Sequence, residues 1–181
     1  EAGTPNVIGD IRAALAFLVK EAVGQDEIEA REAHYAAKAR AVWDKVPGLT
    51  ILGHATAHRL PIFSFTVRGT SGASVHQQLF TRMLSDVYGI QARGGCACAG
   101  PYAHRLLDID QSQSEALLAD LVAGRELQKP GWVRLNFSYL MAEETVDYVI
   151  DCVAQLVGEA EEIASAYDAD PSTARFKPRA A

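Results

Sequence analysis

Residues 93–101 read RGGCACAGP, and the rest of the chain is organised around this stretch. Its three glycines within seven positions allow positive φ angles and close backbone approaches. Pro101 favours a turn or the first turn of a helix. The stretch therefore predicts a shaped loop that carries Cys96 and Cys98. Arg93 comes five residues before Cys98, and a nearby cation or free backbone amides favour the reactive thiolate form of a cysteine.

Two interpretations explain the loop cysteines equally well from the residues alone. Small cysteine side chains beside glycines often fill a tight space without reacting. An unperturbed thiol is mostly protonated at neutral pH, so the surroundings of Cys98 decide whether it is a nucleophile. The third cysteine, Cys152, falls in a long apolar helical stripe and is predicted to be inert packing.

Composition places limits on the class of protein. The 181 residues are 49% hydrophobic, which suits one domain with an ordinary core. The net charge of −6 and the absence of a basic stripe argue against nucleic acid as the main partner. No apolar stretch approaches the length that crosses a bilayer, and no leader pattern opens the chain, which predicts no membrane contact and a cytoplasmic location. Three cysteines, an odd number, predict reduced thiols.

Apolar periodicity predicts the elements of the first half of the chain. Thr4 and Pro5 are typical of an N-cap and a first helical residue. Ser74 is a candidate cap for a later helix that ends at Gly89. The expected elements are helices over 4–23 and 26–45, strands over 50–52 and 61–67, a helix from 74 to 89, and a short strand over 90–92.

The second half of the chain is also predicted to contain both helices and strands. A short helix after Pro101 and another over 114–122 form an excursion, and residues 132–139 alternate as a strand that holds Arg134 on its polar side. A final helix is expected over 143–167, followed by a loose tail from Asp168. This order predicts an α+β fold, a small and mostly antiparallel sheet with helices packed on it, with no internal repeat.

Four stretches in order resemble one family. Residues 2–6 (AGTPN), 89–93 (GIQAR), 98–101 (CAGP) and 133–135 (VRL) are similar to the C-terminal part of class V aminotransferase-fold enzymes, above all to cysteine desulfurases and selenocysteine lyases. The resemblance covers residues 1–157. It implies that residues 1–167 are the C-terminal small domain of a fold type I pyridoxal-phosphate enzyme and that residues 168–181 are a flexible tail.

The resemblance also implies roles for five residues. Cys98 corresponds to the loop cysteine whose thiolate takes the substrate sulfur as a persulfide. Arg134 corresponds to the arginine that binds the substrate α-carboxylate, which suits a permanently charged, two-pronged guanidinium. Arg93 corresponds to the arginine before the loop and is expected to take part in substrate binding. Thr4, with Gly3, corresponds to the segment that reaches the cofactor phosphate of the partner subunit in a homodimer.

Three departures accompany the resemblance. The desulfurases have two histidines directly before the cysteine, where this chain has Cys96 and Ala97. The stretch from Cys98 to Arg134 is longer than usual, so a helical insertion is expected to cover or reshape the pocket entrance. The family's Schiff-base lysine lies in the large domain, and no lysine here matches it. The implied enzyme acts on a small amino acid, with a sulfur-acceptor protein as a further partner, and this chain alone is expected to be inactive.

Three alternatives stay open. A class V transaminase or epimerase would keep Arg134 but use no cysteine nucleophile. A metal module of Cys96, Cys98 and His104 would have at most three ligands, short of a closed tetrahedral site, so no metal is predicted. The chain could also serve as a non-catalytic dimerisation or interaction domain. His54 and His58 lack a second ligand at metal-binding spacing and are expected to be structural or exposed.

Overall fold

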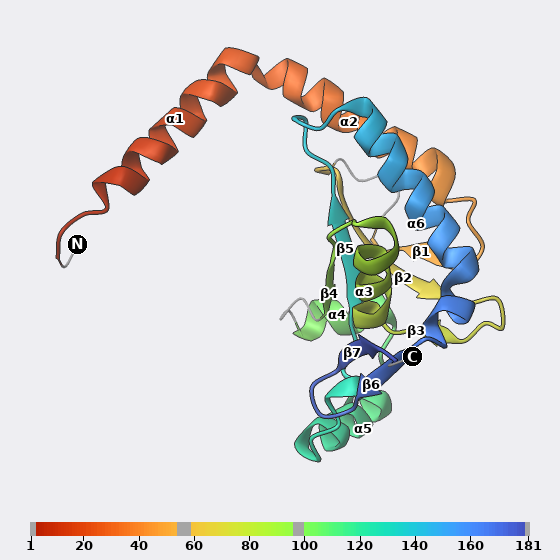
Figure 1. The fold of residues 1–181 in the computed structure, drawn as a ribbon. Coiled ribbons are helices and arrows are strands. Elements are labelled where there is room, and N and C mark those ends of the chain that lie inside the picture. The colour runs from red at the N-terminus through yellow and green to blue at the C-terminus, as the bar shows by residue number, and fades with distance from the viewer. Residues whose placement is uncertain (1–2, 54–58, 96–99, 180–181) are drawn as a thin grey trace.

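The computed structural model describes residues 3–53, 59–95 and 100–179. These residues form the predicted α+β fold, an antiparallel five-stranded sheet with helices packed on it, together with a separate two-stranded hairpin (Figure 1). The strands of the sheet run in the order β1-β2-β5-β4, with β3 paired to β2. The strands are β1 Leu49–Ile51, β2 Ile62–Arg68, β3 Ser74–Val75, β4 Arg93–Gly95 and β5 Trp132–Asn136, and the hairpin is β6 Tyr167–Asp170 with β7 Arg175–Pro178.

Helices cover one face of this sheet and also extend beyond it. Helix α3 packs against both the sheet and α6, and α6 in turn lies along α2 (Figure 1). Two further helices, α4 and α5, form the excursion between β4 and β5. The helices are α1 Val7–Val23, α2 Gln25–Trp43, α3 Gln77–Tyr88, α4 Gly100–Leu107, α5 Gln111–Val122 and α6 Glu143–Ala164, with a short 3₁₀ turn, η1, at Glu126–Gln128.

The core lies between the sheet and helices α2, α3 and α6. Phe63 and Phe65 of β2 are fully buried and lie beside the fully buried Trp43 of α2. The indole nitrogen of Trp43 donates to the carbonyl oxygen of Ile150 on α6 at 3.0 Å. Because strand residues alternate between faces, the intervening Ser64 points to the other side. We call this side, opposite the helices, the open face.

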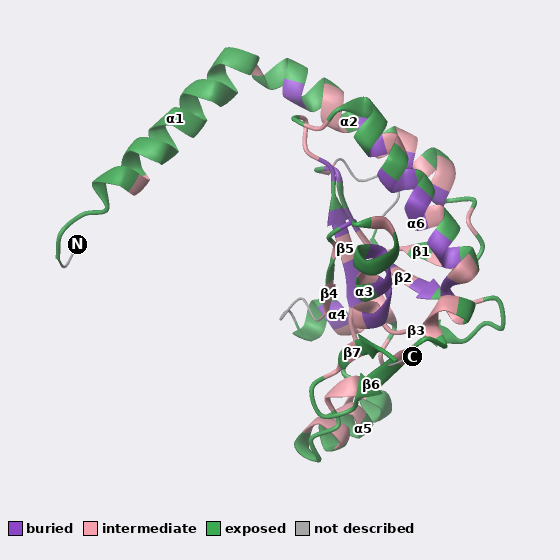
Figure 2. Ribbon diagram, in the orientation of Figure 1, coloured by how far each residue is buried: buried purple, intermediate pink, exposed green. Residues whose placement is uncertain are grey.

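Helix α1 extends away from the sheet as an arm, and none of its residues is buried (Figures 1 and 2). The helix was expected to begin at a Thr4 cap, and this expectation is wrong. The N-cap is Asn6, whose side-chain oxygen accepts a hydrogen bond from the backbone N–H of Gly9 at 3.0 Å. The amide side chain of Asn6 thus satisfies one of the free N–H groups of the first turn. Among the described residues, no helix combines the length and hydrophobicity needed to cross a membrane.

Two other expected boundaries are corrected. Ser74 belongs to β3 and does not cap α3; the cap is His76, whose Nδ1 accepts from the backbone N–H of Gln78 at 3.1 Å. The short strand expected over 90–92 lies instead at Arg93–Gly95. It forms there because these three residues are the ones that pair with residues 132–134 of β5.

The β6–β7 hairpin occupies the segment for which we predicted a loose tail. At its turn, the Asp170 carboxylate accepts hydrogen bonds from the backbone and hydroxyl of Ser172. These and the bonds from Thr173 lower the pKa of Asp170 to about 2. The ring of Phe176 lies 5.1 Å from the His76 ring, between centroids. The Tyr167 hydroxyl also donates to the Asp86 carboxylate of α3 at 2.9 Å. The turn, the aromatic contact and this hydrogen bond organise a segment whose composition is typical of a tail. The domain boundary at residue 167 stays a prediction.

Candidate active site

Two arginines lie opposite each other on the open face of the sheet. The register of the β4–β5 ladder pairs Arg93 directly with Arg134. Arg134 alternates with the buried Val133 and Leu135, so its side chain lies on the open face. Directly paired residues of antiparallel strands share a face, so Arg93 lies there too. The sheet brings together the two arginines for which the sequence analysis predicted substrate binding.

Ser64 continues the pair into a row across the sheet. It is the β2 partner of Arg134, and its carbonyl oxygen accepts a hydrogen bond from the N–H of Leu52, just after β1, at 2.7 Å. The row therefore runs Arg93, Arg134, Ser64 and Leu52. The sequence analysis did not name Ser64. Alternation along residues 61–67 could place it on the polar side, but the pattern does not reveal that β5 is the neighbour of β2.

The charge of the row favours an anion. Arg93 is exposed and Arg134 is half-buried. Within the described ranges, neither side chain makes an ion pair or a hydrogen bond. Like charges placed directly opposite on adjacent strands destabilise a sheet. An anion between them removes this repulsion, and the planar fork of a guanidinium matches the two oxygens of a carboxylate. The arrangement can thus bind a carboxylate on the open face.

Glycines hold β4 against the start of α3. A Cβ on Gly94 would lie 2.7 Å from the carbonyl oxygen of Gln77 and 2.9 Å from its carbonyl carbon, closer than real Cβ atoms approach. The side chain of Gln78 donates to the carbonyl oxygen of Gly94 at 3.0 Å. Gly131, just before β5, likewise approaches the backbone of Gly95. Only glycine permits this packing, which places Arg93 beside Arg134.

The predicted nucleophile, Cys98, and its neighbour Cys96 lie outside the described residues. The chain is described up to Gly95 at the end of β4 and again from Gly100 at the start of α4. The role of Cys98 therefore stays a prediction. Cys152, by contrast, is buried in the core on α6, in agreement with the packing role expected for it.

The structure does not bring Gly3 and Thr4 to the arginine row. Both are exposed and lie in the turn before α1. The 17 residues of α1 correspond to about 25 Å of helix between this turn and α2. Figure 1 shows this end of the chain projecting away from the sheet. The predicted phosphate contact of Gly3 and Thr4 to a partner subunit is therefore not tested by this chain alone.

The described part of the chain contains no cluster of three or more metal-ligating side chains. Both ring nitrogens of His104, the third residue of the alternative metal module, lie near oxygen atoms. Nδ1 donates to the carbonyl oxygen of Gly100 at 2.7 Å, because a carbonyl can only accept. Nε2 then accepts from the hydroxyl of Ser114 at 2.9 Å. His104 thus links α4 to α5, a structural role that uses both nitrogens.

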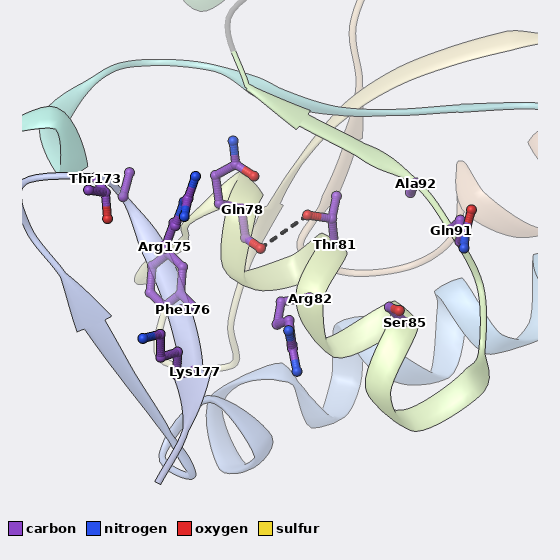
Figure 3. A pocket seen from close by; sticks show the side chains of 11 residues that line it. Gln78, Thr81, Arg82, Ser85, Gln91, Ala92, Thr173, Arg175, Phe176 and Lys177 are labelled. Carbon is purple, nitrogen blue, oxygen red and sulfur yellow. Dashed lines mark hydrogen bonds between the residues drawn. The ribbon is translucent and has the colours of Figure 1, made fainter.

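A separate groove lies on the helical side of the molecule, between α3 and β7 (Figure 3). Arg82 and Ser85 line it from α3, and Arg175 and Lys177 line it from the hairpin. Arg82 pairs with Asp86 one turn further along α3 at 2.7 Å. None of the predicted site residues lines this groove, so it is distinct from the arginine row.

The fold and the paired arginines together define a small α+β domain whose open sheet face carries two adjacent guanidinium groups. The family described as aminotransferase class-V matches residues 1–149. Because the match covers most of the chain, this chain belongs to the aminotransferase class-V family, which confirms the resemblance stated from the four sequence stretches. The β6–β7 hairpin lies beyond the matched residues.

Two relatives have a narrower description, and both are named as a probable cysteine desulfurase of Xylella fastidiosa. The protein of strain Temecula1 / ATCC 700964 is 32% identical over 101 residues, which cover 56% of this chain and 23% of the relative. The protein of strain 9a5c is 32% identical over 103 residues, with the same two shares. The matched part of the chain thus spans about a quarter of the length of these curated relatives.

Proposed function

We propose that this chain is the part of a pyridoxal-phosphate enzyme that binds the carboxylate of a small amino-acid substrate. The pairing of Arg93 with Arg134 carries this proposal. A free amino acid offers a carboxylate, and two guanidinium groups on one sheet face can hold and orient it. Membership of the aminotransferase class-V family supports an amino acid as the substrate class.

The cofactor fits this chain only in part. Pyridoxal phosphate supplies an electron sink when bound and needs a lysine for its covalent attachment. No lysine occurs on β1, β2, β4 or β5, the strands that form the arginine row. The five lysines are Lys20 on α1, Lys38 on α2, Lys45 after α2, Lys129 before β5 and Lys177 on β7. Lys38 is also bound to Glu143 and Asp147 of α6. We therefore assign no step of the reaction through the cofactor to this chain, and expect the chain alone to be inactive.

The finer proposal is cysteine desulfurase-like cleavage of a carbon–sulfur bond. In this proposal Cys98 accepts the substrate sulfur as a persulfide and passes it to an acceptor protein. The names of the two Xylella relatives support it, and so does the position of Cys98 three residues after β4, the strand that carries Arg93. A class V transaminase or epimerase is the alternative in which Cys98 has no chemical role. A homodimer in which Thr4 and Gly3 contact the partner's cofactor phosphate, and a cytoplasmic location, remain predictions.

Carboxylate binding can be tested on the chain itself. The ¹⁵N-labelled chain is titrated with L-cysteine and with cysteamine, which has the same thiol and amine but no carboxylate. We expect L-cysteine, and not cysteamine, to shift the amide signals of Arg93, Arg134 and Ser64. Arg134→Ala should weaken L-cysteine binding about tenfold or more, because a hydrogen-bonded charge pair contributes roughly 1.5–3 kcal/mol. Arg175→Ala, which removes an arginine on the distant β7, is the matched control. Equal binding of cysteamine would contradict the proposal.

The role of Cys98 needs a complete active site. We suggest replacing the matching segment of the Temecula1 relative with the corresponding part of this chain and measuring sulfide release from L-cysteine. Cys98→Ser should abolish sulfide release and leave the visible absorption of the bound cofactor intact, because the serine hydroxyl keeps the shape and cannot form a persulfide. Cys96→Ser is the matched control. Unchanged sulfide release in Cys98→Ser would show that Cys98 is not the nucleophile, and no sulfide release from either protein, with the cofactor bound, would favour the transaminase or epimerase alternative.

A further inference from the structure

A second groove lies on the open face, between the sheet and the excursion formed by α4 and α5. Its volume is about 640 Å³. Thr50 and Thr66 line it from β1 and β2, and Leu52 lines it from the residue after β1. The excursion contributes half-buried apolar side chains, Leu106, Leu107, Ile109 and Leu117, and the polar side chains of Asp108, Gln113 and Asp120. We call this the excursion groove.

The excursion groove adjoins the Leu52 end of the arginine row. Leu52, which lines the groove, is also the last member of the row, since its N–H donates to the carbonyl oxygen of Ser64. Thr66 lies two positions after Ser64 on the same strand face, a separation of about 7 Å. A ligand whose carboxylate is held by Arg134 can therefore extend along the open face into the groove.

The size and lining of the groove indicate what enters it. The side chain of cysteine has roughly the volume of two water molecules, about 60 Å³, and the groove is far larger. Its volume falls in the range typical of small-molecule sites, which are mostly apolar with a few polar groups. Three charged residues also line the groove, but Arg68 and Asp108 are exposed and Asp120 is paired with Arg125. The half-buried part of the wall that has no such partner is apolar, which suits an apolar substituent better than a charged one.

The wall of the groove is held in a fixed position. The hydroxyl of Ser114 donates to His104, which connects α5 to α4. Asp110 and Gln113 form a reciprocal capping box at the start of α5, with hydrogen bonds of 2.8 and 2.9 Å. These hydrogen bonds fix the position of Leu117 and its neighbours, and a site that selects among substrates requires such fixed side chains.

We propose that the substrate is an α-amino acid whose side chain carries an apolar group larger than that of cysteine, for example an S-substituted cysteine, and that the excursion groove binds this group. This inference rests on the proposed function, because the carboxylate of the same ligand is held by the Arg93–Arg134 row. It assigns substrate selection to the insertion between Cys98 and Arg134.

Binding of two amino acids to the full chain tests the proposal. S-Benzyl-L-cysteine and L-cysteine are titrated into the ¹⁵N-labelled chain, and their dissociation constants are compared. Burial of much of a benzyl group should make S-benzyl-L-cysteine bind about tenfold more tightly. It should also shift the amide signals of Thr66 and Leu117, which L-cysteine should leave in place.

Paired variants locate the effect. Leu117→Asp places a charge in the groove wall and should remove the tenfold gain while L-cysteine binds as before. Leu118→Asp is the matched control, because Leu118 is the next residue of α5, is 63% exposed and does not line the groove. Ala116→Trp fills the groove from an exposed position and keeps the test valid if Leu117→Asp does not fold.

The outcomes separate the two proposals. If neither amino acid binds, or if Arg134→Ala changes nothing, the carboxylate site and the groove assignment both fail. If L-cysteine binds through Arg134 but the benzyl group gives no gain, or the gain survives both Leu117→Asp and Ala116→Trp, only the groove assignment fails. A gain that Leu117→Asp or Ala116→Trp removes and Leu118→Asp leaves intact supports it.

Discussion

Arg93 and Arg134 are direct cross-strand partners on one face of the β4–β5 ladder, so two like charges occupy a position where opposite charges would stabilise the sheet. The repulsion lowers the folding stability of the ligand-free domain. An anion bound between the two guanidinium groups cancels this repulsion and therefore stabilises the folded domain. The pairing of the two arginines therefore couples folding stability to anion binding, and its effect can be measured by denaturation and by ligand titration.

Arg93→Gln should therefore stabilise the chain when no anion is present. Removing one of two opposed charges is expected to raise the free energy of unfolding by about 0.2–1 kcal/mol at low salt. The same change should reduce the rise in melting temperature that acetate gives the unaltered chain. Thermal denaturation with and without acetate measures both effects, with Arg105→Gln on α4 as the control. A loss of stability in Arg93→Gln without acetate would show that the pair is not repulsive.

Glu143 should make stability depend on acid pH. Hydrogen bonds from Lys38 and then His34 on α2 lower the pKa of Glu143 to about 2. The folded state thus binds fewer protons than the unfolded state between the ordinary pKa of 4.5 and about 2. The stabilisation is complete above the ordinary value and is lost as the pH falls through this window.

Glu143→Gln should accordingly lower the urea midpoint at neutral pH and make its decline at acid pH shallower. Glu144→Gln changes the neighbouring residue of the same first turn of α6, for which no side-chain partner occurs in the described residues, and should do neither. Urea denaturation across the acid range measures the difference. Identical acid profiles for Glu143→Gln and the unaltered chain would exclude a stabilising role for this carboxylate.

Gly94→Ala should destabilise the domain and weaken carboxylate binding together. The new Cβ would collide with the carbonyl group of Gln77, which is rigid backbone at the start of α3. Relief of the clash must displace β4, at a cost of about 1–3 kcal/mol, and β4 carries Arg93. Chemical denaturation and L-cysteine titration measure the two effects. Gly100→Ala is the control, because its Cβ meets nothing within 4 Å. Wild-type behaviour of Gly94→Ala would mean that β4 is not fixed against α3.

Phe176→Ala should release the hairpin without unfolding the core. The aromatic ring of Phe176 packs against His76, and the β6–β7 hairpin lies outside the five-stranded sheet. Faster amide exchange should therefore be confined to residues 167–178, while the core strands keep their protection. Hydrogen exchange measured by NMR provides the test, with Arg175→Ala as the control. A matching loss of protection in β2 and β5 would show that the hairpin is part of the main cooperative unit.

Much of the fold could be predicted from local pattern. The alternation of Phe63, Phe65 and Val67 indicated a strand with one buried face, and the long stripe of the final helix indicated its packing side. Helix and strand types were correct for most segments because apolar periodicity reports directly on burial. Caps were predicted less well. Asn6 and His76 were missed because several capping side chains stood within a few residues of each other, and the backbone geometry selects among them.

The candidate site was only partly predictable. Arg93 and Arg134 were proposed from the family resemblance, one residue at a time, and nothing local indicated that they would be direct partners. Ser64 and the excursion groove were not foreseen as parts of the site, although an insertion over the pocket was expected. These features depend on which strands become neighbours, and strand order is a non-local property.

The sequence by itself determined that this protein is an α+β domain, and the order of its motifs determined the family. Burial periodicity and short motifs are local features, so both can be identified without knowledge of the tertiary contacts. Only the tertiary structure decided that Arg93, Arg134, Ser64 and Leu52 form one row, and that α4 and α5 border the open face beside it. Pairing across antiparallel strands joins residues dozens of positions apart, and its register is set by the packing of the whole sheet against α3 and α6.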